Sequence, residues 1–264
     1  MFFKRYGRLY WRFLKTNLIR EIQFRSNFWI VNIVTLLWSA TIVLYYVFIF
    51  QHVSSVKGWT LGKVLVLTGI YLLFNSVFKS LLEINFNQFV QIIYNGELDY
   101  VLTKPVNSQF LVSLSRFSLR SFLRLFAGLG ILIWALLAYD IKISVLGVAV
   151  FLISFLLGMV IIYSLWFITF LLAFYLGNIE NLYYLFLPIF QMARVPITVF
   201  PKTVQILFSF VIPLIFIATI PAQALWGNAS WQILLLGVIL TLGLLWLSHY
   251  LWLRALRSYS SASS

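Results

Sequence analysis

The sequence predicts an all-α integral membrane protein with six transmembrane helices. The chain is 62% apolar and only 9% charged, whereas a typical soluble domain is about 45–50% apolar and about 25% charged. Long apolar runs recur, each close to the length of about 20 residues that a helix needs to cross a bilayer core. Cysteine is absent, which excludes disulfides and Cys-based metal sites. We expect one membrane domain over residues 1–257 and a flexible tail over 258–264.

Residues 1–27 predict an amphipathic helix that lies on the inner surface of the membrane. Aromatic and leucine side chains alternate with basic ones, so that the helix has an apolar face and a cationic face that suit the headgroup plane. The basic residues are Lys4, Arg5, Arg8, Arg12 and Lys15. The alternative is an ordinary basic flank before the first span. In both cases the segment lacks the uninterrupted apolar stretch of a cleavable signal.

Six apolar runs predict the transmembrane helices. They cover about residues 28–50, 61–83, 117–139, 144–175, 182–200 and 231–253. In the second run Lys79 and Glu83 are four residues apart, a spacing that allows a modest ion pair on a helix surface. The third run begins with Arg116, Arg120 and Arg124, whose long side chains can reach back to the interface.

The region from 177 to 227 allows two interpretations, because five of the six prolines of the chain interrupt its apolar runs. In one, residues 182–200 form the fifth span and 203–224 form a re-entrant segment that enters the outer leaflet and returns. In the other, 178–202 lies on the inner surface and 204–220 is the fifth span. Broken backbone at membrane depth is tolerated where protein or water covers it. The density of prolines therefore favours the re-entrant segment.

The basic residues predict the orientation. With a re-entrant outer segment, fourteen of the 19 Lys and Arg residues fall inside and five fall outside, which is a strong positive-inside bias. We expect both termini in the cytoplasm and the protein in the plasma (inner) membrane. Because the basic residues lie between long apolar runs rather than in one patch, we expect no nucleic-acid partner.

The sequence offers no catalytic constellation. His52 and His249 are distant in the sequence, and the six acidic residues are scattered. A zinc site needs three or four ligands, and a proton relay needs a chain of Asp, Glu or His. We therefore expect no enzyme and no metal site, and a proton-coupled carrier is disfavoured.

The loop between the second and third spans carries the most information. Gly96 is suited to end the helix that continues from the second span. Glu97 and Asp99 suit the first turn of a new short helix, where carboxylates meet the positive end of the helix dipole. The apolar stripe of that helix consists of Leu98, Val101 and Leu102. Pro105 then stops it. This pattern is consistent either with a docking helix for a soluble partner or with an ordinary solvated turn.

The run from Gly96 to Val106, GELDYVLTKPV, resembles the G-x-L-D-x-x-L-x-[RK]-P-V signature of ABC-2-type permeases. These are the membrane subunits of ATP-binding-cassette exporters. The proline pattern later in the chain is similar to the outer region that precedes the last span of that family. It consists of Phe200-Pro201, Ile212-Pro213 and Ile220-Pro221-Ala222. Together with the predicted topology, the resemblance covers most of the chain.

The resemblance implies partners and a mode of action. Two permease subunits, identical or homologous, would pair in the lipid membrane, and each would dock a separate ABC ATPase subunit. This chain would carry no cofactor, since ATP and Mg²⁺ would bind to the ATPase. The docking residues carried over from the family are Gly96, Glu97, Leu98, Asp99, Val101, Leu102 and Lys104. The expected function is that of a permease in an ATP-driven exporter.

The family shares no substrate-binding motif, so the path can only be guessed from aromatic residues. The candidates are Trp38, Tyr45, Tyr46, Phe74 and Phe78. Aromatic lining would suit an amphipathic or hydrophobic substrate, either a drug-like cation held by cation–π contacts or a lipid-like molecule. The alternative is that these side chains only pack against lipid and form interface belts.

Two other functions remain open at this point. An ATP-independent secondary carrier or channel would show matching interruptions in its two halves, but only the second half of this chain is broken by prolines. A membrane scaffold subunit without a transport path would have the same topology with a closed interior.

Overall fold

The computed structural model describes residues 2–22, 25–119, 122–176 and 180–259. Regular structure in these ranges is helical, apart from an isolated bridge between Val56 and Trp59. The predicted all-α class is therefore confirmed. The predicted tail falls largely on 260–264, which lie outside the described residues, as do 177–179 at the start of the proline-interrupted region 177–227.

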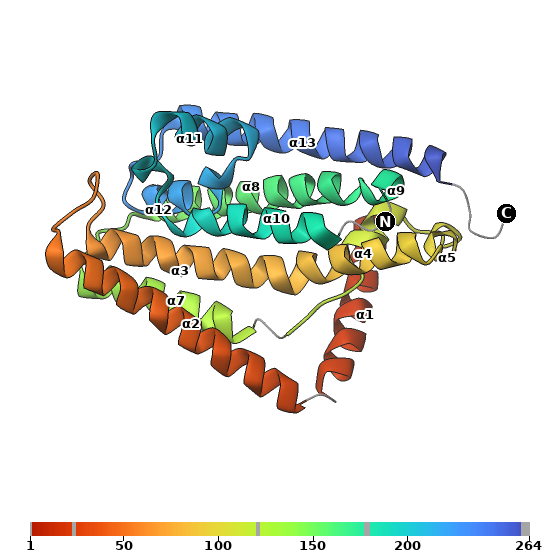
Figure 1. The fold of residues 1–264 in the computed structure, drawn as a ribbon, viewed down its shortest axis with the longest axis horizontal. Helices are drawn as coiled ribbons and strands as arrows, with labels where there is room; N and C mark the ends of the chain where they lie inside the picture. The colour runs from red at the N-terminus through yellow and green to blue at the C-terminus, as the bar shows by residue number, and fades with distance from the viewer. Residues whose placement is uncertain (1, 23–24, 120–121, 177–179, 260–264) are drawn as a thin grey trace.

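The longer helices form the body of the molecule. They are α1 (Phe2–Ile22), α2 (Arg25–His52), α3 (Leu61–Phe78), α4 (Ile84–Tyr94), α7 (Phe122–Ala138), α8 (Val145–Phe170), α10 (Glu180–Gln191) and α13 (Trp231–Ser258). In Figure 1, α3, α8, α10 and α13 run along the long axis, α2 leans away from them, and α1 crosses the end at which α4 and α5 lie.

Short elements connect these helices. The short α-helices are α5 (Leu98–Leu102), α6 (Ser108–Leu114), α9 (Ala173–Leu176), α11 (Lys202–Ile206) and α12 (Thr219–Leu225). The π turns are η1 (Lys79–Glu83) and η4 (Leu207–Val211), and the 3₁₀ turns are η2 (Met192–Arg194), η3 (Ile197–Val199) and η5 (Leu214–Phe216). Figure 1 places α11 and α12 at the end of the molecule opposite α5.

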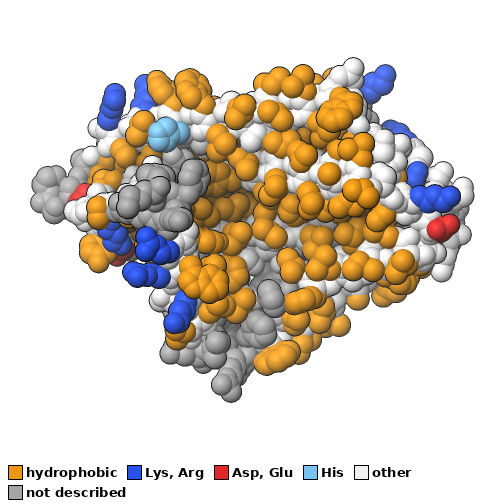
Figure 2. Space-filling view, turned by 180° about the vertical axis from the view of Figure 1, so that it is seen from behind, with side chains coloured by type: hydrophobic (Ala, Val, Ile, Leu, Met, Phe, Trp, Pro, Cys, Tyr) orange, Lys and Arg blue, Asp and Glu red, His pale blue; other side chains and the backbone are white. Residues whose placement is uncertain are grey.

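Four helices within the described ranges are long and apolar enough to cross a membrane. They cover Trp29–His52, Leu61–Tyr94, Val145–Leu176 and Trp231–Ser258. They correspond to the first, second, fourth and last predicted spans. Figure 2 agrees with a membrane location, because apolar side chains cover the middle of the face shown and Lys and Arg side chains gather toward its ends.

The other two predicted spans are shorter than expected. The third begins at Phe122 rather than about 117, and α7 has 17 residues. Tertiary hydrogen bonds explain the late start: the Asn85 side chain accepts from Arg116 N and donates to Arg116 O, both at 2.8 Å, and Ser118 N donates to Ser80 O of η1. The fifth predicted span, 182–200, becomes the 12-residue α10 and two 3₁₀ turns. Val195 between the two turns is extended, as expected for the residue before a proline, so no continuous helix covers this range.

The proline-rich segment from Lys202 to Leu225 forms two arms. Lys202–Val211 makes one short helical arm, and Leu214–Leu225 makes the other, with the break at Ile212 and Pro213. The first arm is far shorter than a membrane span, so a single fifth span over 204–220 is not what forms. The second arm is almost completely buried and contacts α8, where Gly147 lets the backbone carbonyls of Ala224 and Leu225 approach.

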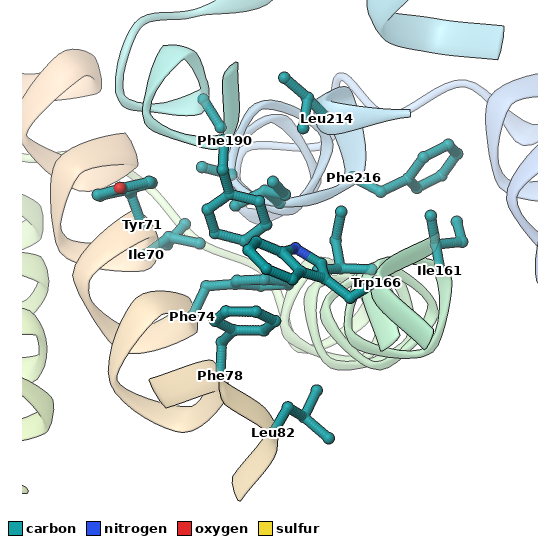
Figure 3. Packing of buried hydrophobic residues seen from close by; sticks show 14 of the residues in the cluster. Ile70, Tyr71, Phe74, Phe78, Leu82, Ile161, Trp166, Phe190, Leu214 and Phe216 are labelled. Atoms are coloured by element: carbon teal, nitrogen blue, oxygen red, sulfur yellow. The ribbon is translucent and has the colours of Figure 1, made fainter. Parts of the chain in front are cut away.

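The core of the molecule surrounds α3. This helix is apolar on all sides, which is the pattern of a buried helix, and most of its side chains are buried. Figure 3 shows Phe74 and Phe78 pointing toward Trp166 of α8 and Phe190 of α10. The rings of Phe78 and Phe190 lie 5.0 Å apart, and those of Phe78 and Trp166 lie 5.3 Å apart. This aromatic cluster joins the first and second halves of the chain.

Glycines bring α3 and α7 into close contact, as small residues do between membrane helices. A Cβ atom added at Gly128 would lie 2.9 Å from Gly69 O and 2.9 Å from Leu73 N. We therefore expect Gly128→Val to lower the free energy of unfolding by about 1–3 kcal/mol through overpacking. Thermal unfolding of the protein in detergent micelles measures this.

The matched control for Gly128→Val is Gly130→Val on the same helix, because a Cβ atom added there would have no neighbour within 4 Å. Both changes place a β-branched residue in the helix, so their intrinsic propensity costs cancel. An equal loss of stability in the two variants would contradict the close contact between α3 and α7.

Candidate functional site

The helix that continues from the second span ends at Gly96, as the sequence predicts. Gly96 has a positive φ of 71°, which favours glycine. Gly96 N donates to Ile93 O at 3.1 Å, and Glu97 N donates to Ile92 O at 2.9 Å. This pair of bonds is the Schellman arrangement that satisfies the last carbonyls of a helix. The chain thus turns sharply and begins α5 within two residues.

The α5 helix has one buried anchor and an exposed outer face. Leu98 is completely buried, whereas Tyr100 is 72% exposed and Leu102 is 39% exposed. The predicted stripe of Leu98, Val101 and Leu102 is therefore split between the two sides. Sequence reasoning missed Tyr100, although its place two residues after Leu98 on a short helix could have indicated an outward side chain. The Lys104 ammonium lies 4.5 Å from the centre of the Tyr100 ring, a cation–π contact.

Tyr259, just after the last helix, holds the beginning of α5. Its hydroxyl donates to Gly96 O at 3.3 Å. Partial desolvation raises the pKa of the Tyr259 hydroxyl, and the nearby Asp99 carboxylate raises it further. The phenol therefore stays neutral at neutral pH and keeps its proton for the Gly96 carbonyl. Local sequence patterns could not predict this contact, since 163 residues separate the two positions.

A groove of about 750 Å³ lies beside α5. Its walls come from α1, α4, α5 and α6, and they include Phe13, Gln88, Ile92, Asp99, Tyr100, Lys104 and Leu111. The N-terminal helix closes one side, because Asn17 Nδ2 donates to Ser115 O at 3.1 Å and Asn107 N donates to the Tyr6 hydroxyl at 3.1 Å. The exposed face of α5 and this groove form one continuous surface at that end of the molecule.

Hydrogen bonds connect the segment after α5 to two long helices. The Tyr163 hydroxyl of α8 lies 3.0 Å from Ser113 Oγ and 3.4 Å from Gln109 Nε2, and His249 Nδ1 of α13 lies 2.8 Å from Gln109 Oε1. Trp252 Nε1 donates to Ser108 Oγ at 3.3 Å. Sequence reasoning missed this network. The polar pair Gln109 and Ser113, four residues apart, was a usable signal for one face of α6.

The aromatic residues guessed for a substrate path lie in two different environments. Trp38 and Tyr45 on α2 are each 61% exposed. Phe74 and Phe78 are buried in the aromatic cluster of α3, α8 and α10 (Figure 3). Tyr46 is buried as well, and its hydroxyl donates to Arg194 O at 2.9 Å. The structure does not bring the five together around one cavity, and the path stays a prediction.

A second cavity lies between α2, α3, α7 and α10, and we call it the arginine pocket. It has a volume of about 260 Å³, and its lining includes Thr35, Trp38, Asn75, Lys79, Arg124 and Arg194. Arg124 donates to Asn75 Oδ1 and, at 3.3 Å, to Thr35 Oγ1. Arg194 Nε lies 3.4 Å from the Tyr71 hydroxyl.

Arg194 lies inside the helical bundle. Its guanidinium lies beside Tyr71, ten residues or about 15 Å along α3 from Leu61 at 1.5 Å per residue. Arg194 therefore contacts the middle of α3. Sequence reasoning missed the pocket because Arg194 reaches it only through the turn η2 that follows α10.

Most of the sequence also matches a known family. The family model described as ABC-2 family transporter protein matches residues 36–263. No curated protein and no solved structure matches the chain. The matched range contains α5, its groove-forming neighbours α4 and α6, and the proline-rich segment over 202–225. Since the match covers most of a chain with several membrane-length helices, the protein belongs to the ABC-2 transporter family as a multi-pass membrane component.

Proposed function

We propose that the chain is the permease subunit of an ATP-driven ABC exporter. Two permease subunits, identical or homologous, form the translocation path, and a separate ABC ATPase docks on each. ATP and Mg²⁺ bind to the ATPase. Membership of the ABC-2 transporter family supports a transport role, and the exposed outer face of α5 is the observation that carries the docking site. Tyr100 and Leu102 present apolar surface there, beside the groove.

The hydrogen-bonded surroundings of α5 supply a route from docking to the spans. When ATP binding draws two ATPase subunits together, each ATPase displaces the α5 helix of the permease on which it is docked. The displacement is transmitted through the Tyr259 hydrogen bond to the end of α13. It is also transmitted through α6 to Tyr163 of α8 and His249 of α13. ATP can shift the equilibrium between the two conformations of the transporter only if it binds them with different affinities. The movement of these helices is the structural difference between the two conformations.

The proposed orientation places α1 and α5 in the cytoplasm. These elements share one end of the molecule (Figure 1). The basic N-terminal segment includes Arg8 and Arg12, and an excess of Lys and Arg is typical of the cytoplasmic side. The plasma (inner) membrane is the expected location, with both termini inside.

Cysteine cross-linking tests this function directly, because the sequence has no cysteine. The Leu102→Cys variant, treated with a bifunctional thiol cross-linker in native membranes, should capture a protein that mass spectrometry identifies as an ABC ATPase. The same variant should resist a membrane-impermeant maleimide added to intact cells. Transport by the reconstituted permease without ATP or any second protein would instead favour a secondary carrier.

The matched control is Tyr175→Cys, another exposed position, on α9 away from the groove. It should give no ATPase adduct, or at most a weak one. Equal cross-linking from both positions, or labelling of Leu102→Cys from outside the cell, would contradict the proposed docking site.

A further inference from the structure

The arginine pocket carries more positive charge than its described surroundings neutralise. Lys79 Nζ lies 3.4 Å from the Glu83 carboxylate. Within the described ranges, neither Arg124 nor Arg194 makes an ion pair with a carboxylate. Their hydrogen-bond partners there are the neutral Asn75 and Thr35 for Arg124 and the Tyr71 hydroxyl for Arg194. Three cations and one carboxylate leave a surplus of two positive charges.

Such a surplus is costly between membrane helices. Charged side chains within spans pair with one another or mark a ligand pathway, and an arginine does not lose its proton in proteins. The planar guanidinium offers paired N–H donors that match the oxygens of a phosphate or carboxylate. An anion between Arg124 and Arg194 would therefore offset the cost of burying them. A cation would be repelled.

The size and rim of the pocket indicate what kind of anion fits. Its volume of about 260 Å³ lies below the about 300–1,000 Å³ of pockets for drug-sized ligands, so it suits a headgroup rather than a whole amphiphile. On the rim, Trp38 is mostly exposed, and its neighbours Val34 and Leu37 on α2 are exposed too. An alkyl chain can lie along this apolar face while the headgroup stays in the pocket.

We propose that the arginine pocket binds the anionic headgroup of an amphiphile, a phosphate or carboxylate attached to an alkyl chain. For transport this inference rests on the proposed permease function, and it selects an anionic substrate over the drug-like cation that aromatic lining alone allowed. The ligand can be a membrane lipid or a free amphiphile, because both present the same group. Binding itself requires only the permease.

Thermal unfolding of the purified permease in dodecyl maltoside tests the binding. Dodecyl phosphate, dodecyltrimethylammonium and inorganic phosphate are titrated at equal concentrations. Dodecyl phosphate should raise the Tm in a saturable way, since a ligand that binds only the folded protein stabilises it by mass action. The other two probes should leave the Tm unchanged. No shift with dodecyl phosphate, or an equal shift with either of the other probes, would overturn the proposal.

Variants locate the site. Arg124→Gln and Arg194→Gln should each weaken the apparent Kd for dodecyl phosphate at least about tenfold, because each removes charge-assisted hydrogen bonds. Arg194→Lys should weaken binding less than Arg194→Gln does, because it keeps the positive charge but loses the paired donors. The control is Arg254→Gln, which removes the same charge from an exposed position near the end of α13 and should change the Kd less than twofold. A shift that survives both pocket substitutions would overturn the assignment.

Thr35→Asp keeps the test decisive if an arginine variant does not fold. The Thr35 hydroxyl lies 3.3 Å from Arg124 Nη2, so a carboxylate there supplies the missing anion from within. This variant should be at least as stable as the unmodified protein without ligand and should no longer respond to dodecyl phosphate. A stable Thr35→Asp protein that still binds the probe would contradict the proposal.

The source of the ligand is separated by mass spectrometry of lipids retained after purification from bacterial membranes. A Tm response to dodecyl phosphate, together with retention of phosphatidylglycerol that Arg124→Gln and Arg194→Gln abolish, supports the pocket with a membrane lipid as its ligand. A Tm response without such retention supports it with a free amphiphile. Since no ATPase is present, failure of docking at α5 leaves these measurements intact and is seen separately.

Discussion

Replacing Tyr100 and Leu102 together with Arg is expected to remove the ABC ATPase from the purified complex and to abolish ATP-driven transport. Both side chains belong to the exposed outer face of α5, where they would pack against the docked ATPase. Two interface hot spots at about 2 kcal/mol each correspond to a roughly 1,000-fold weaker complex. The ratio of ATPase to permease after gentle purification, and the ATPase rate of the reconstituted pair, measure the effect.

The permease itself should survive this double substitution. Leu98, which anchors α5, is untouched, and the two new charges face solvent. The amount of protein in the membrane and its Tm should therefore stay unchanged. Tyr175→Arg, a matched exposed tyrosine on α9, should keep the ATPase bound. Recovery of the ATPase in the original ratio with the double variant would place docking elsewhere.

Trp252→Ala is expected to give the largest loss of stability. This buried side chain on α13 packs against Phe89, Phe167 and Phe174 with ring centres 5.7–6.0 Å apart. It also donates to Ser108 of α6. Truncating a buried Trp to Ala costs about 3–5 kcal/mol, because packing is lost and a cavity remains. Thermal or SDS-induced unfolding in micelles would show the loss.

Trp246→Ala is the control on the same helix. Trp246 is 68% exposed and faces outward from the bundle, so lipid or detergent replaces its contacts and the stability should change by less than about 0.5 kcal/mol. Similar losses for the two variants would mean that Trp252 is not the junction between α4, α8, α9 and α13. If Trp252 holds this junction, its loss should also lower coupling between ATP hydrolysis and transport.

The sequence predicted those features that depend on local patterns. Long uncharged runs are a direct consequence of bilayer thickness, so the four long helices were found. The turn at Gly96 was found because few residues other than glycine adopt its φ. The basic periodicity of residues 1–27 predicted the helix of α1. The family resemblance depended on the short motif from Gly96 to Val106, and the family match over residues 36–263 confirmed it.

Features that depend on distant contacts were not predictable in this way. The late start of α7 comes from Asn85, which lies on another helix and bonds to the backbone of Arg116. The outward position of Tyr100 depends on the burial of Leu98. The arginine pocket forms only after α10 ends early and η2 brings Arg194 to Tyr71. Aromatic content alone did not distinguish Phe74 in the core from Trp38 on the surface.

The π turn η1 gives the second membrane helix a joint. On one side of it α4 leads to α5, and on the other side α3 packs closely against α7 at Gly69 and Gly128. Wide turns of this kind are sites where helices bend and where function concentrates. A tilt of α4 would thus pivot at Lys79–Glu83, and Lys79 lines the arginine pocket. Under the proposed docking, a push on α5 would therefore move one wall of that pocket.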